Sequence, residues 1–207
     1  MIARMSKNIS SFFSMHGIIS ADDREVYEYS FEVLFSYLFS FFATVIIALL
    51  SGTVFYTALY FVGFIPLRLV AGGFHAKNHL RCFIILMLVY LTFLLTLLLL
   101  SDIVMRVSII ASIIFSILLV FMMAPSEDTN KPISDNDSVR LRRSSRTTVV
   151  GFSALIGLLV TFVPDIRIAF SVAMGTLTVG ASLLSNYVKH KGKMIIIEEE
   201  VILNEED

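Results

Sequence analysis

Long apolar runs separated by short charged segments constrain this chain more than any other feature of its sequence. Six such runs are present, at approximately Phe31 to Leu50, Val54 to Leu67, Phe83 to Leu100, Val107 to Ala124, Thr147 to Val163 and Ile168 to Val188. A membrane-spanning helix needs roughly 17 to 25 apolar residues. Hydrophobic residues make up 57% of the chain, more than the roughly 45 to 50% of soluble domains. The sequence therefore predicts an all-α, polytopic integral membrane protein with about six transmembrane helices.

The second run has only about 14 residues, so it is also short enough to be a re-entrant or buried segment. The basic side chains favour a crossing. If all six runs cross, 14 of the 16 Lys and Arg residues share the side of the two termini, and only Arg106 and Arg167 lie opposite. Because cytoplasmic loops are enriched in Lys and Arg, we expect a multi-pass protein of the cell membrane with both termini and the 68–82 loop in the cytoplasm.

Three regions follow from this reading. Residues 1–29 mix apolar and charged side chains and are predicted to form an amphipathic segment on the membrane surface, with a flexible cytosolic arm as the alternative. Residues 30–188 form the six-span membrane domain, and residues 189–207 a cytosolic C-terminal tail. The basic 125–146 loop is expected to be a flexible link that anchors the topology. The alternative for this loop is a docking surface for acidic residues of a substrate.

The polar segment RLVAGGFHAKNHLRC, from Arg68 to Cys82, holds the residues best suited to chemistry. Cys82 is the single cysteine, so the chain has no intrachain disulfide. An imidazole such as that of His75 can take the thiol proton and leave a reactive thiolate. If residues 75–82 were one helix, the two side chains would lie about 10 Å apart along its axis, too far for a hydrogen bond. The pair therefore needs a bend, which Gly72 and Gly73 permit, and spacing alone leaves open that Cys82 only packs.

A zinc site competes for the same segment. His75, His79 and Cys82 follow the pattern H-x3-H-x2-C, which puts three potential zinc ligands on one helical face. The pattern lacks the glutamate that serves as the base in H-E-x-x-H zinc proteases. A zinc-binding membrane protein or a small transporter that uses these three residues stays an alternative. Against a transporter, five of the six runs have no ionisable residue within their apolar cores, where substrate paths usually carry one.

Two short motifs together resemble a known family. The arrangement R-x4-G-x-H-x6-C, followed by AP and KP in APSEDTNKPI (124–133), is similar to the accessory gene regulator B (AgrB) proteins of quorum-sensing systems. The resemblance implies that Cys82 is the nucleophile and His75 the general base of a cysteine endopeptidase, with no metal and no cofactor. The supporting positions that it implies are Arg68, Gly73, Lys131 and Pro132.

The resemblance also implies a substrate and partners. The expected substrate is a short signalling propeptide of the AgrD type, cleaved through an acyl thioester on Cys82 and released as a thiolactone or lactone ring. The expected partners are this propeptide, the lipid bilayer and a second copy of the chain, with no nucleic acid. Gly157, Gly175 and Gly180 would let helices approach closely in such a membrane protein.

Overall fold

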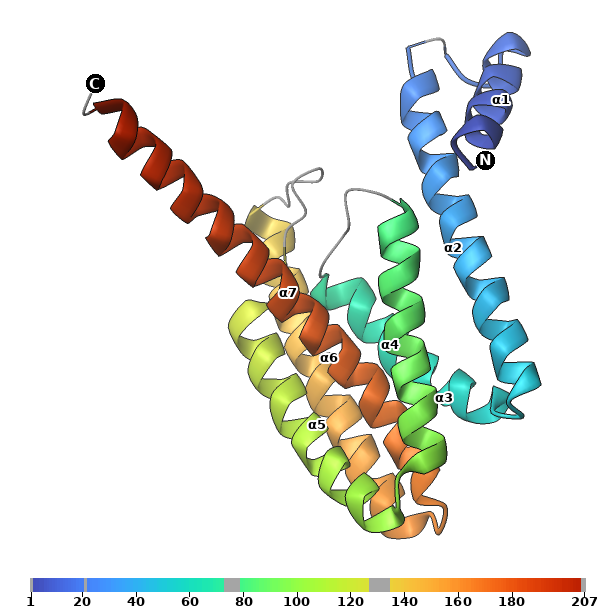
Figure 1. Cartoon of the computed structure of the whole chain (residues 1–207), viewed down its shortest axis with the longest axis vertical. Helices are drawn as coiled ribbons and strands as arrows, with labels where there is room; N and C mark the ends of the chain where they lie inside the picture. Colours follow the sequence, from blue (N-terminus) through green and yellow to red (C-terminus); the bar gives the residue numbers. More distant parts are fainter. Residues whose placement is uncertain (1, 21, 73–78, 127–134, 206–207) are drawn as a thin grey trace. The chain divides into compact units, whose positions relative to one another are not determined.

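The computed structural model describes residues 2–20, 22–72, 79–126 and 135–205, and for some helical residues, among them 79–82 and 189–205, it describes only the backbone. Helices account for almost all of these residues (Figure 1). Their bounds are α1 Ile2–Met15, α2 Arg24–Leu50, α3 Val54–Ala71, α4 His79–Leu99, α5 Asp102–Met123, α6 Asp135–Phe162 and α7 Ile166–Glu205.

The predicted all-α membrane fold is confirmed. The structure is 88% helical, with no β-strand among the described residues. Five of the described helices, α2, α3, α5, α6 and α7, are long and apolar enough to cross a membrane. The third predicted run lies in α4, whose stretch Phe83–Leu99 is apolar but shorter. Each of the six apolar runs therefore lies in a helix of its own.

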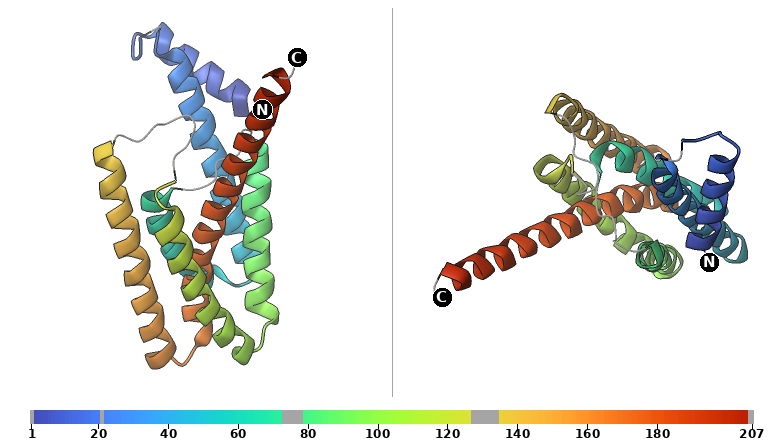
Figure 2. Two further views of the ribbon diagram at one scale, coloured as in Figure 1. Left: turned by 90° about the vertical axis from the view of Figure 1, so that its left-hand side faces the viewer. Right: turned by 90° about the horizontal axis from the view of Figure 1, so that it is seen from above.

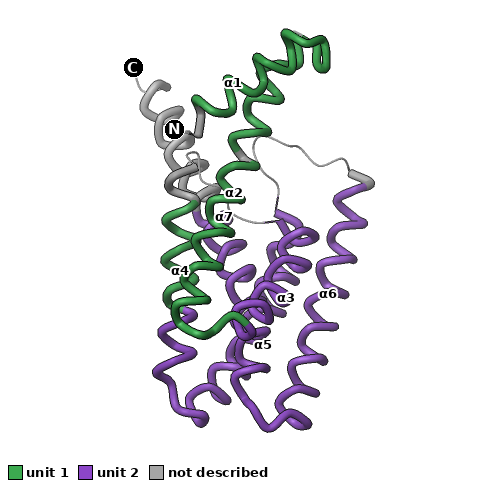
Figure 3. Tube along the Cα trace, turned by 90° about the vertical axis from the view of Figure 1, so that its right-hand side faces the viewer, with its two compact units in different colours: residues 1–54, 76–92 green, residues 55–75, 93–207 purple. Residues whose placement is uncertain are grey.

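Two compact units make up the chain (Figure 3). Unit 1 contains residues 1–54 and 76–92, and unit 2 contains residues 55–75 and 93–207. In unit 1, α1 packs on α2 through an edge contact of the Phe13 and Phe31 rings, with centroids 5.6 Å apart. Ser6 and Ser10 are buried, whereas Phe12 and Met15 are exposed. Within the predicted segment 1–29, α1 thus has apolar side chains at its surface, and the placement of this segment on the membrane surface stays a prediction.

In unit 2, α5, α6 and α7 lie side by side (Figures 1 and 2), and α3 crosses α7 where Gly63 and Gly175 meet. A Cβ added to Gly63 would collide with the backbone of Val172, and one added to Gly175 with the backbone of Tyr60. Gly180 faces Leu119 of α5, whereas a Cβ added to Gly157 would meet no described atom of another helix within 4 Å. Two of the three glycines expected to permit close approach therefore do so within the chain.

Two hydrogen bonds at opposite ends of α3 fix its direction against α7. Tyr56 donates to Asp165 Oδ2 over 2.6 Å before α7 begins, and Arg68 donates to Ser182 Oγ over 2.8 Å. Asp165 and Ser182 lie about 25 Å apart along a helix axis, close to the roughly 30 Å of a bilayer core. The continuous α3 therefore has the reach of a spanning helix, as the charge distribution predicted for the second run.

A buried apolar cluster lies at the Arg68 end of unit 2. It joins residues of α3, the end of α5, α6 and α7: Leu67, Ala71, Val120, Ala124, Val149, Val179 and Leu183. Because these residues come from four segments far apart in sequence, their packing sets where the chain leaves α3 and α5. Both loops of the predicted site follow those two helix ends.

The expectation of a flexible link over residues 125–146 is wrong in part, because α6 already begins at Asp135. Acidic residues in a first helical turn interact favourably with the helix dipole, and Asp135 and Asp137 occupy that turn. The α7 helix likewise continues to Glu205, well past the end of α5 (Figure 2). Its last part is rich in Glu and Ile and contains no proline. The cytosolic location of this tail stays a prediction.

Candidate active site

The described residues contain part of the predicted site. Arg68 lies in the last turn of α3, and Cys82 lies in the first turn of α4, where only the backbone is described. The same holds for His79. The other predicted residues lie outside the described residues: Gly73, His75, Lys131 and Pro132. The pairing of thiol and imidazole therefore stays a prediction, and so does the alternative zinc site.

Arg68 connects the end of α3 to α7. Its half-buried guanidinium donates from Nη1 to the backbone oxygen of Gly72, over 2.8 Å, and to Ser182 Oγ, over 2.8 Å. The last carbonyls of a helix lack partners within that helix, and a basic side chain near a C-terminus satisfies them and interacts well with the helix dipole. Arg68 thus positions the chain at the point where α3 ends.

Gly72 ends α3 in a conformation that glycine adopts at little cost. Its φ is +73°, in the left-handed region where a side chain is disfavoured. Its N–H still bonds to the Arg68 oxygen over 3.1 Å. Gly72 and Ser126 form an isolated parallel bridge, in which the Ser126 N–H donates to the Ala71 oxygen over 3.0 Å. A Cβ on Gly72 would lie 2.6 Å from the Ser126 oxygen, so the close approach requires glycine.

Ser126 is also held by α7. The Asn186 side-chain amide donates to Ser126 Oγ, and Asn186 is only 6% exposed. Ser182 and Asn186 are four residues apart and so lie on one face of α7. That face binds both segments at once, through Arg68 on α3 and through Ser126 after α5.

We call Arg68, Gly72, Ser126, Ser182 and Asn186 the loop-root cluster. Residues 73–78 follow it directly after Gly72, and residues 127–134 follow it directly after Ser126. The first segment contains Gly73 and His75, and the second contains Lys131 and Pro132. The two motif segments thus start from one hydrogen-bonded cluster, although more than 50 residues separate them in the chain.

The cluster can position groups but has no side chain suited to proton transfer. Its only ionisable group is the Arg68 guanidinium, which stays protonated in proteins. Among the described residues, which do not include His75, no group of three His, Cys, Asp or Glu side chains could bind a metal ion.

Sequence reasoning identified Arg68 and the glycine pair but missed Ser126, Ser182 and Asn186. One signal was available for Asn186. A side-chain amide within an apolar run is costly in a membrane unless it has a partner, and Asn186 lies in the sixth run. Ser126 stands inside the APSEDTNKPI motif, but its partners come from other helices.

Comparison with known proteins identifies one family. The model of accessory gene regulator B (AgrB) matches residues 5–185 of this chain. The match includes most of α1, all of α2 to α6 and α7 as far as residue 185, and it contains both loops that start at the loop-root cluster. No curated protein and no solved structure matches the chain.

Proposed function

Because the chain belongs to the accessory gene regulator B family, we propose that it is a membrane-embedded cysteine endopeptidase that converts a short signalling propeptide to a cyclic autoinducer. Family membership supports a role in processing an AgrD propeptide in quorum sensing. The apolar helices and the family together make the chain a multi-pass membrane protein. The thiol mechanism, the residues that carry it, the cytoplasmic side of the site and a homodimeric state are proposals.

The reaction begins with proton transfer from the Cys82 thiol to His75. The thiolate then attacks a peptide carbonyl of the propeptide, and the C-terminal fragment leaves as an amine with the proton returned by His75. An acyl thioester remains on Cys82. A Cys or Ser side chain of the bound N-terminal fragment next attacks the thioester, which frees Cys82 as a thiol and closes a thiolactone or lactone ring.

Cyclisation competes with hydrolysis of the thioester by water. Exchange of one thioester for another is nearly thermoneutral, so the outcome depends on which nucleophile reaches the acyl carbon. Exclusion of water from a site favours the bound side chain. Cys82 lies directly before the apolar stretch Phe83–Leu99, a position suited to a dry site at the membrane boundary.

The bridge between Gly72 and Ser126 is the structural observation that best supports this function. The motif with the proposed base and the motif with Lys131 and Pro132 both follow it. A cysteine peptidase must hold its base and its substrate-binding groups to within fractions of an ångström. This requirement predicts that the two segments start from one shared attachment point, as they do at the bridge, whereas a scaffold protein has no need of it.

The test is intact-mass spectrometry of the full chain in lipid after incubation with the propeptide encoded beside it. Wild type should carry an acyl adduct and release a C-terminal fragment. Cys82→Ala should abolish both, and His75→Ala should slow cleavage by about 100-fold or more, the usual contribution of a general base.

His79→Ala is the matched control, since it removes a neighbouring imidazole that the thiol mechanism does not use. It should leave cleavage near the wild-type rate. Equal loss of activity in His75→Ala and His79→Ala, together with bound zinc that either change removes, would reject the cysteine mechanism and favour the zinc site.

A further inference from the structure

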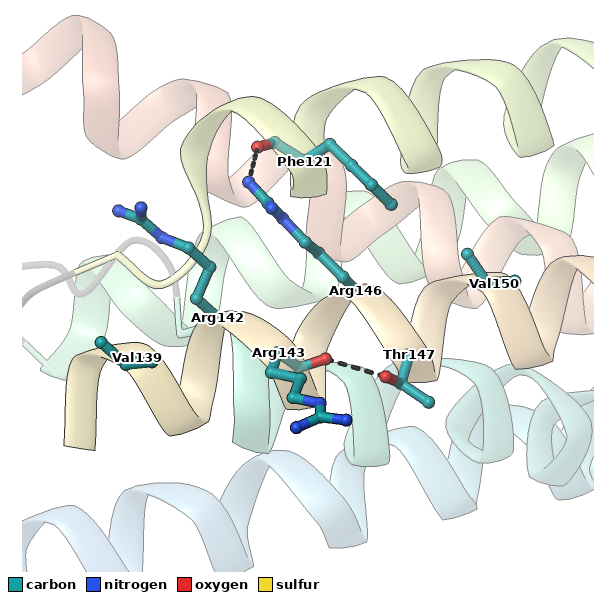
Figure 4. A pocket seen from close by; sticks show the side chains of 7 residues that line it. All are labelled: Phe121, Val139, Arg142, Arg143, Arg146, Thr147 and Val150. Atoms are coloured by element: carbon teal, nitrogen blue, oxygen red, sulfur yellow. Dashed lines mark hydrogen bonds between the residues drawn. The ribbon is translucent and has the colours of Figure 1, made fainter. Parts of the chain in front are cut away.

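A shallow groove of about 540 Å³ lies on the surface of unit 2, beside the end of α5 and the first turns of α6 (Figure 4). Three of its seven lining residues are arginines and none is acidic. The residues that line it are Phe121, Val139, Arg142, Arg143, Arg146, Thr147 and Val150. The proposed reaction uses none of them.

Arg146 is held in place at the side of this groove. Its Nη2 donates to the Phe121 oxygen over 3.0 Å, and its guanidinium lies 5.0 Å from the centroid of the Phe121 ring. Its Nε is buried and has no hydrogen-bond partner among the described residues. A buried donor without a partner is unfavourable. The Arg146 guanidinium is therefore held in one position beside the groove, although its Nε donor stays unsatisfied.

Arg142 adds a second cation on the same side of α6. Figure 4 shows the Arg142 and Arg146 side chains both extending on the side where Phe121 lies. Arginine presents a planar fork of donors that matches phosphate oxygens. Two guanidinium groups on the same side of α6, with no carboxylate in the lining, favour an anion such as a phosphodiester.

The apolar part of the groove indicates that the anion belongs to an amphiphile. Phe121 is 41% exposed and Val150 is 49% exposed, so both leave apolar surface beside the arginines. Beyond Val150, α6 continues into its apolar stretch, and a Cβ on Gly151 or Gly157 would meet no described atom within 4 Å. Open space along an apolar helix face, directly below cations at the membrane boundary, suits an acyl chain.

From this arrangement we propose that the groove binds an anionic phospholipid. The phosphodiester accepts hydrogen bonds from Arg142 and Arg146, and Arg143, whose side chain extends away from Phe121 in Figure 4, adds positive charge nearby. One acyl chain lies along α6 past Val150 and Gly151. The occupant is a lipid rather than an acidic peptide because the cationic and apolar surfaces are arranged in the order of a lipid's headgroup and chain. The basic start of α6 then acts as a specific binding site in addition to its expected role as a topology anchor.

Native mass spectrometry of the purified full chain in detergent, titrated with phosphatidylglycerol or with phosphatidylcholine of the same chains, tests this site. Wild type should retain phosphatidylglycerol in preference to phosphatidylcholine. Each arginine near an anionic headgroup contributes about fivefold in affinity, so Arg142→Gln with Arg143→Gln should weaken phosphatidylglycerol binding by about 25-fold. Arg146 is left unchanged because its bond to Phe121 also supports packing.

The matched control is Arg140→Gln with Arg106→Gln. It removes the same charge from two exposed arginines that do not line the groove. Retained phosphatidylglycerol binding in this control, with thermal unfolding unchanged in both double variants, is the expected result. Equal weakening in the two double variants would show that net charge alone attracts the lipid, and would overturn the site.

Two competitors separate a lipid from other anions. Inorganic phosphate in millimolar excess should not displace phosphatidylglycerol, because it lacks the acyl chain, and displacement would reduce the groove to a phosphate site. A soluble hexaglutamate peptide should also leave the lipid bound. Its displacement of the lipid in wild type would overturn the proposal in favour of an acidic protein segment. These assays do not require peptidase activity, so they stand apart from the proposed function.

Discussion

Replacement of Gly72 by alanine tests whether the bridge at the loop-root cluster positions the catalytic segments. The φ of +73° at Gly72 would cost a non-glycine residue roughly 1 to 2 kcal/mol. The new Cβ would also lie 2.6 Å from the Ser126 oxygen. To relieve this contact, the bond from the Ser126 N–H to Ala71 must lengthen or break, at about 1 kcal/mol more. The Gly72→Ala change should thus destabilise the bridged conformation by about 2 to 3 kcal/mol relative to conformations without the bridge.

Gly52→Ala is the control that separates the backbone penalty of a positive φ from the steric contact with Ser126. Gly52 has nearly the same φ, +67°, but a Cβ there would meet no described atom within 4 Å. It should therefore pay only the backbone penalty, and it lies outside the bridge. If the bridged conformation is the one that cleaves, a loss of 2 kcal/mol at Gly72 lowers kcat/KM about thirtyfold. Gly52→Ala should stay close to the wild-type value.

The assay is the initial rate of propeptide cleavage, followed by mass spectrometry in lipid nanodiscs at equal amounts of folded protein. Thermal unfolding of both variants is measured alongside to correct for folded fraction. Equal cleavage rates in Gly72→Ala and Gly52→Ala would refute the reasoning, because the contact with Ser126 would then have no effect on the catalytic segments.

Three further changes test the packing around the same cluster. Asn186→Leu removes the hydrogen bond to Ser126 and should lower the cleavage rate about fivefold, the equivalent of about 1 kcal/mol, with the chain still folded by circular dichroism. Arg68→Lys keeps the charge but loses the guanidinium geometry, so kcat/KM measurements should show a partial loss, smaller than that of Arg68→Ala. Gly175→Ala overpacks the site where α3 crosses α7, so it should lower the free energy of unfolding by about 1 to 3 kcal/mol and with it the thermal unfolding temperature. Gly157→Ala should leave that temperature unchanged. Similar unfolding temperatures for the two variants would contradict the close approach.

The sequence predicted which segments are helices because the bilayer imposes a length of apolar residues that is easily counted. It predicted the ends of those helices less well. The first run was expected from Phe31, yet α2 begins at Arg24, and the fifth was expected from Thr147, yet α6 begins at Asp135. Apolar composition marks only the part of a helix inside the bilayer. Backbone hydrogen bonding continues into polar sequence wherever no glycine or proline stops it.

The candidate site was predictable only where its residues share a local motif. The spacing from Arg68 to Cys82 is readable because the residues lie in one short segment. The contact of Gly72 with Ser126 is different, since it depends on how the ends of α3 and α5 pack on α7. Asn186 joins this contact from a third helix. Such proximity is a property of tertiary packing, and a single sequence holds no local pattern that reports it.

The bridge at the base of the two motif segments is made from backbone atoms. The bond from the Ser126 N–H to the Ala71 oxygen needs no particular side chain at either position, and its steric demand is that residue 72 carries no Cβ. The bridge itself therefore requires no particular side chain in residues 73–78 and 127–134, and only the proposed site residues Gly73, His75, Lys131 and Pro132 restrict their sequence. Grafting either segment from another family member, with Gly72 and Ser126 kept as the junctions, offers a modular route to redirecting which propeptide is recognised.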